Sequence, residues 1–132
     1  MQNNRIDKLL PVAYDILKND DTIVREGKID KALRGQISSF GAAILTGSLS
    51  SAVAFYSSQG RAKTPRQALP NVILQILKKG NLLLEEDQVA IKNKSVEDLK
   101  DLVLVSKDPE LQGKITDASI AIKLAMNFFT LT

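Results

Sequence analysis

The stretch QISSFGAAILTGSLSSAVAFYSS, from Gln36 to Ser58, holds two apolar helical patterns that meet at one break, Thr46-Gly47. No linker separates the two patterns, so the two helices must pack against each other at close range. Gly47 ends the first pattern, where glycine tolerates the positive φ that a helix end often takes. The region predicts a helical hairpin core, and its short side chains near the break are Ala42, Ala43, Ala52 and Ala54.

Helical periodicity extends from this hairpin toward the amino terminus. The first helix of the hairpin is expected from Lys28 to about Thr46, because its apolar residues recur on one side. The second is expected from about Ser48 to Ser58. An earlier helix follows Asn3 or Asn4, and Pro11 is expected to kink it or to set a later start. No alternating polar and apolar run in the chain indicates a strand.

Downstream of the hairpin, Thr64-Pro65-Arg66-Gln67 is the clearest helix start, with a threonine cap, proline at the first helical position and glutamine completing a capping box. This helix is expected to end at Lys78-Lys79-Gly80. From Glu85 to Lys94 the pattern leaves a short helix and an ordered loop both open. Ser95, followed by Asp98 three residues later, predicts another helix start.

Asp108-Pro109-Glu110 predicts a further start, and Gly113 is expected to end that turn early. The last helix is expected from Thr116 to about Thr130, with Lys123 as its only charge after Asp117. A helix that is apolar almost all round belongs in the centre of a bundle, the alternative being an interface. The sequence therefore predicts one compact all-α domain, residues 1–132, with about five to seven helices.

Composition excludes several kinds of site. The chain has no cysteine, so a disulfide framework and a thiolate metal site are impossible. It has no histidine, which removes the commonest general base and the commonest transition-metal ligand. Glu85-Glu86-Asp87 and Asp20-Asp21 lack the alternating carboxylates and glycine of a calcium loop. We therefore expect a protein without enzymatic activity, metal or cofactor.

Charge and hydropathy indicate where the protein works. The beginning of the chain, MQNNRIDKLL, has no apolar core of signal-peptide length. The longest apolar stretch, Ala42 to Tyr56, is interrupted by polar residues and is too short to cross a bilayer. We expect a soluble cytoplasmic protein with no membrane contact. The net charge is only +3, so binding to nucleic acid requires local basic patches.

Three basic groups are candidates for contact with an RNA backbone. Lysine and arginine there add affinity without reading the sequence. Because aromatic residues are few, we expect contacts to phosphates and not to bases. For each group the alternative is an ordinary solvated surface. The candidates are a loop group (Arg61, Lys63, Arg66), a stripe on the hairpin's first helix (Lys28, Lys31, Arg34) and a helix-end pair (Lys78, Lys79).

Nine residues of the hairpin region follow one another in a recognisable order: Ile44, Gly47, Leu49, Ala52, Ala54, Phe55, Tyr56, Ser57 and Ser58. This order resembles the motif of the small helical subunit of type III-B CRISPR effector complexes, the RNA-guided Cmr complexes. That family has an isoleucine, a Gly-Leu corner, an Ala-x-Ala-Phe helix start, an aromatic residue or leucine and then a small polar pair. The last element of the family is a basic tail helix opened by a threonine, and Lys114-Ile115-Thr116-Asp117-Ala118 also fits it. The chain departs from the family at three places. Ser48 separates Gly47 from Leu49, and Phe40-Gly41 stands where the family often has proline. Asn127-Phe128 stands where an aromatic-basic ending is common.

The resemblance covers most of the chain and implies a non-catalytic scaffold role in antiviral defence. Such subunits stack head to tail in a minor filament, beside the other subunits of the complex, and flank the duplex of guide RNA and target RNA. The basic groups are then expected to face the RNA. Two other classes remain open: a helical DNA-binding transcriptional regulator, with Pro65 to Lys79 as its recognition helix, and a small metal enzyme using paired carboxylates.

Overall fold

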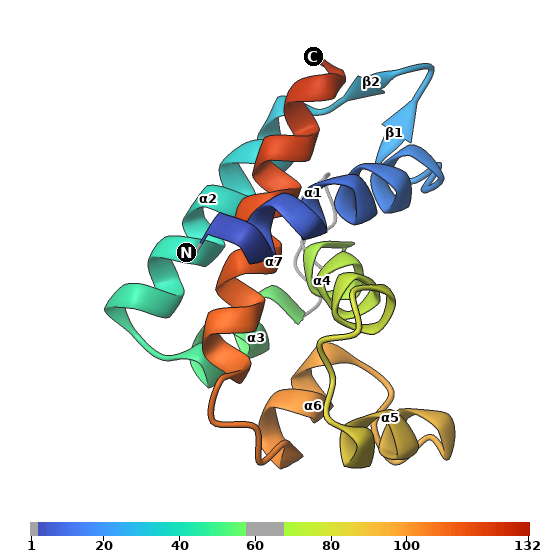
Figure 1. The fold of residues 1–132 in the computed structure, drawn as a ribbon. Helices are drawn as coiled ribbons and strands as arrows, with labels where there is room; N and C mark the ends of the chain where they lie inside the picture. The colour runs from blue at the N-terminus through green and yellow to red at the C-terminus, as the bar shows by residue number, and fades with distance from the viewer. Residues whose placement is uncertain (1–2, 58–67) are drawn as a thin grey trace.

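Helices dominate the fold, and a minor sheet joins two distant parts of the chain (Figure 1). The structure, a computed structural model, describes residues 3–57 and 68–132. In these residues the α-helices number seven, which confirms the predicted all-α bundle. The elements are α1 (Asn3–Lys18), β1 (Val24–Arg25), β2 (Lys28–Ile29), α2 (Lys31–Thr46), α3 (Leu49–Ser57), α4 (Ala68–Lys79), α5 (Glu85–Lys92), α6 (Leu99–Val105), α7 (Leu111–Ala125), the 3-10 helix η1 (Met126–Phe128) and β3 (Thr130–Leu131).

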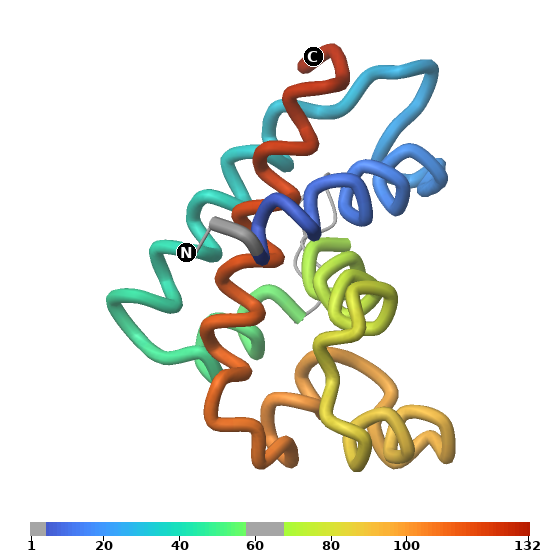
Figure 2. Tube along the Cα trace, in the orientation of Figure 1, coloured from blue at the N-terminus to red at the C-terminus, as the bar shows by residue number. Residues whose placement is uncertain are grey.

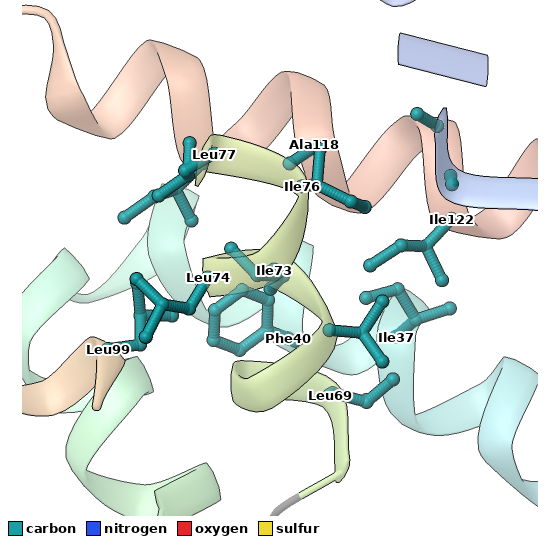
Figure 3. Packing of buried hydrophobic residues seen from close by; sticks show 14 of the residues in the cluster. Ile37, Phe40, Leu69, Ile73, Leu74, Ile76, Leu77, Leu99, Ala118 and Ile122 are labelled. Carbon is teal, nitrogen blue, oxygen red and sulfur yellow. The ribbon is translucent and has the colours of Figure 1, made fainter. Parts of the chain in front are cut away.

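Helix α7 is the centre of the fold. It packs against α1, α2 and α4, and Figure 1 shows it running the length of the molecule between them. Figure 3 shows Phe40 of α2, Ile73 of α4 and Ile122 of α7 in the core that these helices share. All three side chains are buried. The prediction that the last helix lies in the centre of the bundle is confirmed.

The predicted hairpin is present as α2 and α3. Its two helices pack together, and the rings of Phe40 and Tyr56 meet edge to face, with centroids 5.3 Å apart. The expected positive φ at Gly47 is wrong, since φ there is −116°. Glycine suits this position for another reason: its N–H donates to the carbonyl oxygen of Ala43, and a Cβ would lie 3.1 Å from that oxygen.

The sheet corrects the expectation that the chain has no strand. β2 pairs antiparallel with β1 and parallel with β3, so Lys28 lies opposite Thr130. Figure 2 shows the end of the chain, marked C, beside the segment that contains β2. Lys28 therefore does not begin a helix, as expected; α2 begins at Lys31, and the carboxylate of Asp30 accepts a hydrogen bond from the Ala32 N–H (2.9 Å). β3 follows Lys28 by about a hundred residues in sequence, and local periodicity cannot reveal such a partner.

Two helix boundaries in the second half differ from expectation. α7 begins at Leu111, so the start signal at Asp108-Pro109-Glu110 is confirmed and the expected start at Thr116 is wrong. Gly113 does not end the turn, since the helix continues through it to Ala125. The expected extension to Thr130 is also wrong, because η1 and β3 follow.

Three further boundaries concern α5, α6 and α1. The segment from Glu85 forms helix α5 to Lys92. The cap of α6 is Asp98 and not Ser95, because the Asp98 carboxylate accepts from the Asp101 N–H (2.9 Å). α1 runs through Pro11, so the later start considered for it is wrong. The start signal at residues 64–67 lies outside the described residues.

Candidate nucleic-acid interface

Five of the eight candidate RNA-binding residues lie in the described part of the chain. Lys28 is on β2, Lys31 and Arg34 are in the first turn of α2, and Lys78 and Lys79 end α4. Four of these side chains are exposed and Arg34 is half-buried. The loop group (Arg61, Lys63 and Arg66) lies outside the described residues.

The structure does not bring the stripe and the helix-end pair together. The junction of β2 and α2 lies beside the end of the chain marked C (Figure 1). α4 ends where the chain turns toward α5 and α6, which lie at the opposite end of the molecule in the same view. A small anion cannot contact both groups. Only an elongated ligand, such as a nucleic-acid strand, can reach from one to the other.

The described cations of these groups are available to an outside anion. Among residues 3–57 and 68–132 the ion pairs join Arg5 to Asp117 and Lys114 to Asp108, so none of the five candidates takes part in one. The stripe does have acidic neighbours in sequence, Glu26 and Asp30. In contrast, residues 73–84, which surround the helix-end pair in sequence, contain no acidic residue. The helix-end pair is therefore the less neutralised of the two groups.

A basic residue that sequence reasoning missed accompanies the helix-end pair. Lys78 and Lys92 line one shallow hollow of about 430 Å³ between the end of α4 and α5, together with the amide side chains of Asn81 and Gln88. Lys92 falls in the segment for which a helix and a loop were both open; it is the last residue of α5. Two ammonium groups and two amides at one hollow can bind a phosphate through charge and hydrogen bonds.

Another hollow, of about 970 Å³, lies between α1 and the start of α7 and has mixed charge. Arg5 Nε donates to Asp117 Oδ2 at 2.7 Å across it, so these two charges largely neutralise each other. Lys8, Gln112 and Thr116 are the other polar residues at its wall. Because Arg5 and Asp117 are paired, Lys8 is the remaining charge among the residues that line this hollow, so it offers little net attraction to a polyanion.

Two properties of the described ranges concern clustered metal ligands and helices that could cross a membrane. There, no three Asp or Glu side chains gather in a group that could hold a metal ion. Among the helices of the same ranges, none has both the length and the apolar character needed to cross a membrane.

Comparison of the chain with family models, with curated proteins and with solved structures finds no match. Its function must therefore be inferred from the residues of the chain itself.

Proposed function

We propose that this protein is a non-catalytic small subunit of a type III-B CRISPR RNA-guided complex, where it contacts the RNA backbone and contributes to antiviral defence. The observation that carries the proposal is the set of cations at two distant places on one small helical domain, none of which forms an ion pair within the described residues. An elongated polyanion is the ligand that such an arrangement suits. Among RNA-binding proteins, we favour this class because the residues of the α2–α3 corner resemble those of the small subunit of type III-B CRISPR complexes.

The proposed partners are the other subunits of the complex, the duplex of guide and target RNA, and further copies of this chain in the cytoplasm. Uneven charge supports stacking of copies head to tail. Residues 85–110, which include α5 and α6, carry eight acidic and four basic side chains, whereas the rest of the chain carries seven acidic and fourteen basic ones. Unlike surfaces attract each other, and a contact between unlike surfaces can propagate where a two-fold contact closes.

The alternative, a DNA-binding regulator with residues 65–79 as its recognition helix, is less compatible with this fold. A recognition helix must enter the major groove with an exposed face. α4 instead packs against α1, α3, α6 and α7. Most of its residues are buried: Leu69, Pro70, Val72, Ile73, Leu74, Ile76 and Leu77.

RNA binding of the purified chain tests the proposal directly. The measurement is fluorescence anisotropy with a labelled single-stranded RNA across a series of salt concentrations. We expect affinity to fall with salt, and Lys78→Ala with Lys79→Ala to reduce the slope of log K against log salt by up to about 1.4, or about 0.7 for each phosphate that is no longer neutralised. The matched control is Lys94→Ala with Lys100→Ala, which removes two exposed lysines from the acidic region.

The outcomes separate the hypotheses. Equal reductions in affinity for the two double variants, or affinity that is independent of salt, would contradict RNA contact at the helix end. Preference for duplex DNA would favour the regulator. Recovery of CRISPR effector subunits and guide RNA with a tagged copy from the native host would support the assembly. Their absence from cells that express such a complex would contradict it.

A further inference from the structure

The fold brings Tyr14 together with two aromatic residues near the other end of the sequence, the adjacent Phe128 and Phe129. Tyr14 of α1 stacks on Phe129, with ring centroids 5.2 Å apart and planes at 14°. The same tyrosine meets Phe128 edge to face, with centroids at 5.6 Å. The chain has only six aromatic residues, so half of them are in this one cluster. Their low number led to the expectation that bases are not contacted, and that expectation did not anticipate this clustering.

The cluster forms one side of an open apolar hollow of about 320 Å³. Its walls are Leu10, Pro11, Tyr14 and Phe128, and almost no polar surface faces it. Phe128 is 67 % exposed, so most of its side chain is accessible to a ligand. Phe129 is partly buried against the core and stacks on the Tyr14 ring. The hollow thus has one wall, Tyr14, that is braced through Phe129 by the core, and another wall, Phe128, that is exposed.

Lysines lie near this hollow. Lys18 Nζ is 6.0 Å from the centroid of the Tyr14 ring. Lys28, one of the candidate RNA-binding residues, is exposed on β2 opposite Thr130, two residues beyond Phe128. Asp15 and Asp7 are the exposed acidic side chains of α1 in this region, and they keep the local charge moderate. A ligand that suits this place has a flat apolar face and a negative charge at its edge.

The geometry points to the hollow as a binding site for an unpaired nucleobase of single-stranded RNA. The base stacks on Phe128 and contacts the aliphatic walls, while its sugar and phosphate stay outside, where Lys18 and Lys28 reach the phosphates. Every base has a π face, so such a site is tolerant of sequence. Bases paired in the guide–target duplex cannot enter it, so the base that it takes belongs to RNA outside that duplex. This inference rests on the proposed function and deepens it, because it adds base contact to backbone contact.

The test compares two exposed phenylalanines. Phe128→Ala removes the stacking ring, Phe128→Tyr keeps one, and Phe55→Ala is the matched control, since Phe55 is 55 % exposed on α3. The probe is a short single-stranded RNA with one 2-aminopurine, whose fluorescence is quenched on stacking. We expect Phe128→Ala to weaken binding about 5- to 150-fold and to abolish the quenching, as the removal of one stacked base predicts. Phe128→Tyr and Phe55→Ala should bind the RNA as tightly as the wild-type protein and should still quench the 2-aminopurine fluorescence.

Circular dichroism and the melting temperature check that each variant folds, which the exposure of Phe128 leads us to expect. Equal binding by Phe128→Ala and the wild-type protein overturns the base site and leaves the proposed function standing if Lys78 and Lys79 still matter. Failure of the wild-type protein to bind any RNA overturns both. A change in sedimentation of Phe128→Ala, with RNA binding intact, identifies the hollow as a protein contact and also overturns the base site.

Discussion

Replacing Lys114 with methionine removes an ammonium group that joins two distant segments of the chain. Its Nζ donates to the carboxylate of Asp108, just before α7, and to the carbonyl oxygen of Leu82 (2.9 Å), between α4 and α5. The side chains are 13 % exposed for Lys114 and 5 % for Asp108. The Lys114→Met variant keeps most of the aliphatic stem and deletes only the charge and the donors.

The expected loss of stability in Lys114→Met comes from the two groups that lose their partner. Asp108 stays buried with one donor, the Glu110 N–H at 2.8 Å, and the Leu82 carbonyl loses its side-chain donor. Removing one partner of a buried ion pair costs about 3–5 kcal/mol. Because this pair retains slight exposure, we expect the free energy of unfolding to fall by about 3 kcal/mol, the lower end of that range. For a domain of this size the melting temperature should fall by about 10 °C.

The ion pair should also make the stability of the protein depend on pH, through the pKa of Asp108. Burial raises the pKa of Asp108, but the hydrogen bonds from Lys114 and the Glu110 N–H, with the charges of Lys114 and Arg5, outweigh it, so the pKa lies below its ordinary value of 3.8. A lowered folded-state pKa stabilises the protein above pH 3.8, and this contribution is lost as the pH falls through the folded-state pKa. The difference between wild type and Lys114→Met should therefore narrow in acid.

Urea unfolding followed by circular dichroism, repeated from neutral pH to below pH 3.8, measures both effects. Lys123→Met is the matched control, since Lys123 is exposed on the same helix, and its stability should change by less than about 0.5 kcal/mol. Combining Lys114→Met with Asp108→Asn should recover part of the stability, because no buried charge is then left unpaired. If the free energy of unfolding of Lys114→Met lies within about 0.5 kcal/mol of the wild-type value at neutral pH, the Lys114–Asp108 ion pair does not stabilise the fold as argued.

Three smaller changes test other parts of the fold, each by chemical denaturation. Gly35→Ala should stabilise α2 by up to about 1 kcal/mol, because a Cβ there meets no atom within 4 Å and glycine is a poor helix former; destabilisation would show that the position is crowded. Gly80→Ala should destabilise by about 1–3 kcal/mol, since its Cβ would lie 2.8 Å from the Ile76 carbonyl oxygen, and an unchanged midpoint would contradict this. Asp98→Ala should cost about 1 kcal/mol by removing the α6 cap, with Glu97→Ala as a neutral comparison.

The fold was predictable where the signal was local. The break between α2 and α3 is visible in the sequence because a glycine and short side chains stand between two apolar patterns. The start of α7 was only partly predictable, since Asp108-Pro109-Glu110 indicates it but Gly113 argues for an end that does not occur. β2 was not predictable, because it has only two residues and one of the strands that it pairs with, β3, lies near the other end of the sequence.

The candidate site, like the fold, could be predicted where the signal is local and could not where it depends on packing. Sequence identifies Lys28, Lys78 and Lys79 as surface cations, because charged residues at helix ends and in polar connections rarely become buried. It cannot show that the stripe and the helix-end pair lie apart, or that Lys92 joins Lys78 at one hollow. Each of these facts depends on how helices pack.

The central position of α7 has a consequence during synthesis. A ribosome releases α1, α2 and α4 before the helix on which all three pack, and domains fold as units once their contacts can form. Until then these helices can pack against one another and against α3, but the faces that they turn toward α7 have no partner within the nascent chain. Truncated translation products that lack α7 should therefore expose these apolar faces and aggregate more readily than the whole chain.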